Sequence, residues 1–365
     1  MHLFMTLVVL ALLSNGTAFA SEQKKTATTT STNGELKTII QDRIKYYNNK
    51  YPDIHFVHLT GGKDWPGELI AIITMLGSQV SAMDYEHPPE LREDVMEVSL
   101  ARLRRMLKHD IVSATQFRLG QDSIFERPQL CVITLNPDTF IASDREATQY
   151  MLDVSDDVLE KIHLSRYLDH KDHLEFALDH EAYHCLDSHY HGGAPMTHET
   201  LGGEYHLFRR ENAADAYAMA KHIKSRRKVT AYARNLVHYR ALWLFTDSPN
   251  RCTFETVREV LKYQPDTLVN MSDKELRKLA VKLRDGAVRP YDGYVQQRSA
   301  ALTAAKVLGL DPVLYGDQWS DSENIETNPE LVASLVNRYR YYYDQLFTDD
   351  VIPLEAPSLS EALQR

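Results

Sequence analysis

Apolar residues recur at helical spacing along most of the chain, and only two short runs follow a different pattern. The runs Ile54–Leu59 and Gln129–Leu135 are compact and apolar, which is typical of strands. Helical spacing is found in nine segments: 35–49, 93–108, 172–187, 205–226, 229–246, 253–263, 273–285, 292–308 and 329–347. The pattern therefore predicts an α+β fold that is predominantly α-helical, with one small sheet.

The N-terminus has the features of an export signal. Its first twenty residues contain no Lys, Arg, Asp or Glu, and an apolar stretch from Leu3 to Leu13 leads into Ala18-Phe19-Ala20. That stretch is too short to span a membrane, and a small-x-small cleavage pattern follows it. We therefore expect a signal peptide at 1–20, with a retained anchor as the alternative. The polar, Thr-rich segment 21–34 predicts a flexible leader.

Composition and charge narrow the class of partner. The chain has 365 residues, 43% of them hydrophobic, and a formal net charge of −10. A negative field repels nucleic-acid phosphates, so we expect no nucleic-acid partner. No later stretch has about 18 uninterrupted apolar residues, so we expect no stable membrane insertion after signal cleavage. The expected location is the periplasm or the medium, and the oligomeric state is left open.

The three cysteines, Cys131, Cys185 and Cys252, are too few for a disulfide scaffold. One disulfide is compatible with this number, but the sequence does not select the pair. There is no Cys-x-x-Cys spacing, so zinc-ribbon, thioredoxin and haem-attachment motifs have no support. Cys185 directly follows a histidine of the motif described next, and on a helix it points about 100° away from that neighbour.

A His-Glu-x-x-His motif lies in the helical segment 172–187, where His180 and His184 are four residues apart. Residues at this spacing share one helix face, so the two imidazoles can converge on one tetrahedral metal ion. Glu181 lies beside the pair and not between them. Its carboxylate can therefore reach a water at the metal without taking a coordination site, which is what a general base needs.

A second acidic motif follows 27 residues after His184. Glu211 and Asp215 are one helical turn apart, and the residues between them include Ala213 and Ala214. Small residues let helices approach closely, so this segment can bring Glu211 to the metal as third ligand. Asp215 is then placed to accept a hydrogen bond from a ligand imidazole and to fix its orientation.

These two motifs resemble those of the gluzincin metallopeptidases, in which His-Glu-x-x-His is followed on a second helix by Glu-x-x-x-Asp. The resemblance covers about 45 residues, from Phe176 to Met219. It implies a zincin-like core at 35–270 with two metal-binding helices and Zn²⁺ as cofactor. The helical spacing beyond this core predicts a C-terminal helical region at 271–365. Arg210 departs from the thermolysin-like branch, which has Asn before the third ligand, and this puts the orientation of the second imidazole in question.

The residues that follow the motif offer two alternatives to Glu211 as third ligand. A metzincin needs Gly and His three and six residues after the motif, but Asp187 and Tyr190 stand there. His189 and His191 are close enough in sequence to bind a metal, although a His-Tyr-His-Gly-Gly segment is more often a solvated loop. Glu211 is the better candidate.

The implied reaction is peptide-bond hydrolysis, with Glu181 as base and proton shuttle. A further donor must stabilise the tetrahedral oxyanion. His238 and Tyr239 are placed first for this role, with packing in a core as the alternative. The wider set of donor candidates also includes His198, Tyr205, His206 and Arg240.

The strand at Leu130 to Leu135 has two interpretations. The resemblance implies an exposed edge that takes an extended peptide by β-addition, whereas its continuous apolarity favours burial on both faces.

We therefore expect an exported zinc metallopeptidase that acts on a peptide or protein substrate. Two alternatives stay open: a non-catalytic binding protein of the same fold, and a zinc amidase that acts on a non-protein amide of the cell wall.

Overall fold

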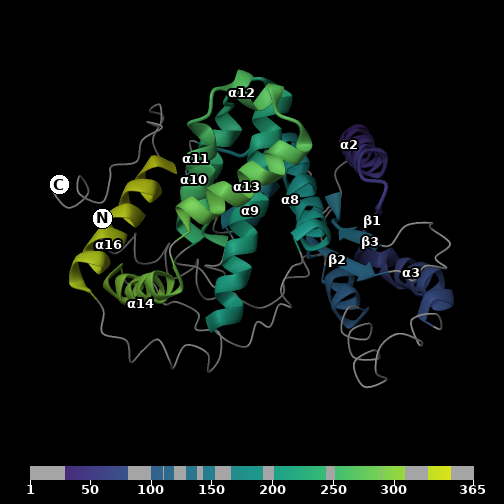
Figure 1. Cartoon of the computed structure of the whole chain (residues 1–365), viewed down its shortest axis with the longest axis horizontal. Helices are drawn as coiled ribbons and strands as arrows, with labels where there is room; N and C mark the ends of the chain where they lie inside the picture. Colours follow the sequence, from purple (N-terminus) through teal and green to yellow (C-terminus); the bar gives the residue numbers. More distant parts are fainter. Residues whose placement is uncertain are drawn as a thin grey trace. The chain divides into compact units, whose positions relative to one another are not determined.

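Helices predominate in the computed structural model, and its strands form one three-stranded sheet (Figure 1). The predicted α+β, mainly helical fold class is thereby confirmed. The structure describes residues 29–80, 100–109, 111–118, 129–137, 143–152, 166–191, 201–243, 251–288, 290–308 and 328–346. The expected signal peptide at 1–20 lies outside these residues. Within them, no helix is long and apolar enough to cross a membrane.

The described residues belong to two compact units, and each is taken by itself. Of the described residues, the first unit contains those within 21–146 and 170–193, and the second contains those within 147–169 and 194–365. The elements in chain order are α2 (Thr29–Lys50), β1 (Ile54–Leu59), η1 (Gly62–Asp64), α3 (Trp65–Val80), β2 (Ser113–Arg118), β3 (Gln129–Thr134), α6 (Asp144–Leu152), α8 (His170–His191), α9 (Leu201–Arg226), α10 (Ala231–Leu242), α11 (Phe254–Leu261), α12 (Pro265–Asn270), α13 (Asp273–Ala287), α14 (Tyr291–Leu308) and α16 (Pro329–Leu346).

The sheet of the first unit has the strand order β1-β3-β2. β1 is parallel to β3, and β2 is antiparallel to it. Every residue of β3 is buried, as its continuous apolarity indicated. The other interpretation, an edge at Leu130 to Leu135 that binds a peptide, is wrong because β3 is hydrogen-bonded to a strand on each side.

Apolar side chains from the sheet and two helices form the core on one side of this unit. The helix at 100–108 and α3 pack against the sheet here. The buried residues of this core come from both helices and all three strands: Leu59, Ile72, Leu76, Leu103, Leu107, Phe117, Leu130 and Val132. On the other side, α8 contacts β2, β3 and α2. The sheet therefore supports the helix that carries His180 and His184.

The start of α2 differs from the predicted leader at 21–34. The helix begins at Thr29, and the hydroxyl of Thr38 donates to the carbonyl oxygen of Gly34 at 2.9 Å. Thr and Ser are weak helix formers, but a helix with a packed apolar face extends into such residues at low cost. The leader expected from composition is therefore shorter by residues 29–34, and 21–28 lie outside the described part.

In the second unit α9 is the central helix, and α10 to α14 contact it (Figure 1). Its middle is rich in small side chains that are all buried: Ala213, Ala214, Ala216, Ala218 and Ala220. Because alanine side chains are small, neighbouring helices can approach the α9 backbone closely, so several helices can pack on α9 at once. α13 is among them, although it belongs to the predicted C-terminal region at 271–365. The predicted bounds at 35–270 and 271–365 stay a prediction.

Candidate metal centre

The two motif histidines meet near the middle of α8, a helix of 22 residues. Their Nε2 atoms are 3.0 Å apart, and their ring planes are inclined at 85°. Two nitrogens bound to one tetrahedral zinc at about 2.0–2.1 Å lie about 3.3 Å from each other. His180 and His184 therefore converge as the helical spacing predicted, at nearly the separation that a shared ion requires.

On one side, α8 is held by a charged cluster from α2. The Tyr47 hydroxyl donates to Asp179 Oδ1 at 2.7 Å, and Arg43 Nη1 is 3.6 Å from Asp179 Oδ2. Arg43 also donates to Glu175 at 2.6 Å. Burial alone would lower the pKa of the Arg43 guanidinium, but the Asp179 and Glu175 carboxylates together raise it above its ordinary value. The residue directly before His180 is thus fixed by two partners.

On the other side, α8 is bonded to the sheet. Cys185 forms a disulfide with Cys131 of β3, and both residues are fully buried. The side-chain amide of Gln116 donates to the backbone carbonyl oxygen of His184 at 3.1 Å. Cys252 takes no part in this disulfide and is buried in the second unit. A buried disulfide is consistent with an oxidising, extracytoplasmic environment.

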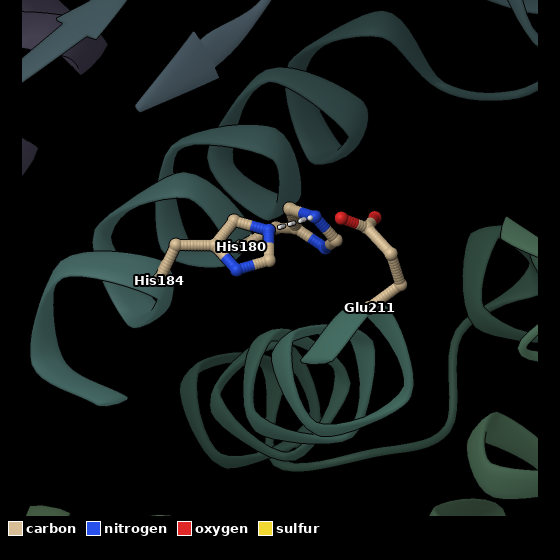
Figure 2. Close-up of side chains that lie close together, drawn as sticks. All are labelled: His180, His184 and Glu211. Atoms are coloured by element: carbon tan, nitrogen blue, oxygen red, sulfur yellow. Dashed lines mark hydrogen bonds between the residues drawn. The ribbon is translucent and has the colours of Figure 1, made fainter. Parts of the chain in front are cut away.

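Glu211 of α9 completes a group of three candidate ligands. One ligand atom each from His180, His184 and Glu211 lies within 4.8 Å of the other two. Figure 2 shows the Glu211 carboxylate directed toward the imidazoles. Only 9% of the Glu211 surface is exposed. Among the described residues, no other three His, Cys, Asp or Glu side chains bring their ligand atoms within 4.8 Å of one another.

The chemistry of this donor set fits a divalent metal ion. Two neutral imidazoles and one carboxylate are ligands that zinc accepts, at distances of about 2.0–2.2 Å. Other transition metals bind the same ligand types, so the donors are suited to a metal ion without selecting one metal. Three protein ligands also leave coordination positions open, as catalytic sites do and closed structural sites do not.

Glu181, the predicted base, follows His180 and is 9% exposed. Its burial shields the carboxylate from bulk water, which suits a general base. Its role stays a prediction.

Asp215 is buried completely and is paired within the second unit. Arg240 Nε is 2.8 Å from Asp215 Oδ2, and Arg240 Nη2 donates to Oδ1 at 3.0 Å. The Thr253 hydroxyl also donates to Oδ2. Arg240, one of the wider donor candidates, is therefore placed as a partner of Asp215. The role predicted for Asp215, accepting a hydrogen bond from an imidazole, stays a prediction.

His238 and Tyr239 are buried in α10. The Tyr239 hydroxyl donates to the carbonyl oxygen of Arg166 at 2.5 Å, and burial raises the pKa of this hydroxyl. His238 Nδ1 is 3.1 Å from the carbonyl oxygen of Arg234, and burial lowers the pKa of the imidazole to about 4. These surroundings match the packed alternative for both residues. Their service as oxyanion donors stays a prediction.

The remaining candidates are His189 as a metal ligand, and Tyr205, His206 and His198 as oxyanion donors. α8 continues to His191, so His189 is helical and not in the loop that the sequence suggested. Tyr205 packs its ring 5.4 Å from that of Tyr294, and His206 is exposed. His198 lies outside the described residues.

No protein-family model, curated protein or solved structure matches this chain. The resemblance to gluzincins therefore rests on the residues of α8 and α9 themselves.

Proposed function

We propose that this chain is an exported zinc metallopeptidase. The observation that supports this most is the grouping of His180, His184 and Glu211, two of which stand in a His-Glu-x-x-His motif. A metal site alone would be equally compatible with a structural role. The glutamate inside the motif favours catalysis, because it supplies a base beside a site whose ligand set is incomplete.

In this proposal His180, His184 and Glu211 would hold a zinc ion, which would supply Lewis-acid chemistry toward water and toward the carbonyl of the scissile bond. The carboxylate of Glu181 takes a proton from the attacking water. The same carboxylate then delivers that proton to the nitrogen of the departing amine, so the base is regenerated in each turnover. Asp215 holds a ligand imidazole in place, and a hydrogen-bond donor stabilises the oxyanion.

Export is supported by two separate features. The N-terminal pattern predicts a signal peptide, and the Cys131–Cys185 disulfide fits an oxidising compartment. A peptidase with this location meets peptide or protein substrates outside the cytoplasm.

The test is cleavage of a diverse peptide library by the purified mature protein, beside its Glu181→Gln variant. Glu181→Gln keeps the shape of the side chain and removes its basicity. We expect the parent to cleave peptides and to lose this activity in a chelator, and zinc addition to restore it. Glu181→Gln should bind zinc as the parent does and cleave at least about 100-fold more slowly.

Two other outcomes would redirect the proposal. Zinc binding without cleavage of peptides, but with hydrolysis of cell-wall amides, would identify an amidase. Zinc binding with neither reaction would leave a binding protein.

A further inference from the structure

We propose that the Cys131–Cys185 disulfide positions His184 for metal binding, so that the site reaches full affinity only after the chain is oxidised. The inference rests on the proposed metal function and adds its dependence on redox state. The disulfide, Gln116 and both histidines belong to the first unit.

The argument begins with one residue pair in the sheet. Gln116 of β2 and Cys131 of β3 lie directly opposite each other in the antiparallel register. These two side chains hold two successive residues of α8. Gln116 donates to the carbonyl oxygen of His184, and Cys131 is bonded covalently to Cys185. Strand neighbours thus fix the backbone of α8 at the position of a metal ligand.

The second step is the asymmetry between the two histidines. His180 follows Asp179, which is held by Tyr47 and Arg43 of α2. His184 lies one turn further along α8 and directly precedes Cys185, so the disulfide acts on the helix at this histidine. Loss of the disulfide therefore leaves His184 held by Gln116 without the covalent bond beside it, while the bonds from α2 next to His180 stay in place.

This release affects the metal because two ligands must keep a fixed separation. The Nε2 atoms of His180 and His184 are now 3.0 Å apart, close to the value needed around one ion. A helix that moves by a fraction of an ångström at His184, or that opens there, presents this pair only part of the time. The apparent metal affinity is the intrinsic affinity multiplied by the fraction of time in which the pair is formed.

The redox step is an ordinary thiol–disulfide exchange. The thiols of Cys131 and Cys185 lose two protons and two electrons as their sulfurs bond, and a disulfide oxidant such as glutathione disulfide is reduced to two thiols. The oxidised sulfurs are fully buried, so the bond is protected once the unit has folded. In a reducing cytosol the cysteines stay as thiols, and the unexported chain holds metal weakly. Oxidation after export completes the site.

The experiment compares Zn²⁺ and Co²⁺ affinities, by chelator competition, for the parent and a Cys131→Ala/Cys185→Ala variant. Cys252→Ala is the matched control, because it removes a buried cysteine outside the disulfide. We expect the double variant to bind roughly 10- to 100-fold more weakly, the range typical for residues that orient a ligand, and the control to bind as the parent does. Gln116→Ala should shift affinity in the same direction by less.

The Co²⁺ absorption spectrum gives a readout that a purely structural role would not move. In the double variant we expect the visible bands to change, because His184 is no longer held in one geometry. A folded double variant with the parent's affinities and the parent's spectrum would overturn the inference. A parent that binds neither metal would instead overturn the proposed function.

If the double variant does not fold, the parent itself supplies the comparison. It is reduced by dithiothreitol in mild urea, returned to buffer without oxygen, and freed of reductant by gel filtration. Reduced protein that binds Zn²⁺ as tightly as the oxidised protein contradicts the inference, and weaker binding that recovers on reoxidation supports it.

Discussion

The two helices that carry the candidate ligands are stabilised in different ways. α8 is held by specific polar and covalent bonds next to its ligands, from α2 on one side and from the sheet on the other. α9 is held by dense packing of alanines against the helices of its own unit, with one buried ion pair at Asp215. A motif of two histidines and a glutamate identifies the first helix, whereas small-residue packing and one paired carboxylate characterise the second. Substitutions near α8 should therefore act by breaking specific bonds, and substitutions near α9 by disturbing its packing or its buried ion pair.

The largest expected effect comes from breaking the buried pair of the second unit. Arg240→Met removes the charged partner of Asp215 and leaves its carboxylate buried, which costs about 3–5 kcal/mol of unfolding free energy. The measurement is urea denaturation of the metal-free protein. The double variant Arg240→Met/Asp215→Asn should recover much of the loss, because the uncompensated charge is gone. Arg209→Met, which breaks an exposed pair with Asp285, should cost at most about 1 kcal/mol. Equal losses for both arginines would show that the buried pair has no special weight.

The second effect depends on pH and also concerns the second unit. Burial, with a smaller contribution from Arg166, lowers the pKa of His238 to about 4, below its ordinary value of 6.5. Between these two values the unfolded chain binds a proton that the folded chain does not. The free energy of unfolding therefore falls as pH drops from 6.5 toward 4, by about 3 kcal/mol in total, and this contribution is absent above pH 6.5.

His238→Asn is the matched variant, because it removes the titration at a constant cost. Its unfolding free energy should fall less than the parent's over the same pH range, in metal-free buffer. Parallel pH profiles for the two proteins would contradict the assignment.

A smaller effect is expected from the polar hold on α8. Tyr47→Phe removes the hydroxyl that donates to the buried Asp179 and keeps the ring, so it should cost about 1.5–3 kcal/mol of unfolding free energy. Tyr46→Phe, at a neighbouring tyrosine that is 37% exposed, is the control and should stay within about 0.5 kcal/mol. If both substitutions are neutral, α8 does not depend on its bonds to α2.

Local patterns in the sequence predicted most helices and two of the three strands. β1 begins and ends where its apolar run does, at Ile54 and Leu59. β2 was missed because its six residues, SATQFR, alternate weakly and contain only one large apolar side chain, Phe117. Its pairing with β3 becomes visible only in three dimensions, since neighbours in a sheet are set by contacts far apart in the chain.

The candidate site was predictable to the extent that its signals are local. The spacing of His180 and His184 fixes their shared helix face, so their approach could be foreseen. The disulfide could not, because three cysteines allow three pairs and only the packing of α8 on β3 selects one. The partners of Asp215, Arg240 and Thr253, lie 25 and 38 residues further along the chain, and no short-range pattern connects them.

The most direct test of the central claim is the zinc content of the purified mature protein, measured by elemental analysis after dialysis against zinc and then against metal-free buffer. His184→Ala and Glu211→Ala are compared with His109→Ala, which removes an exposed histidine outside the site. We expect about one zinc per chain in the parent and in His109→Ala, and much less in His184→Ala and Glu211→Ala. A parent without zinc, or zinc retained equally by all the variants, would contradict the assignment of His180, His184 and Glu211 as a metal site.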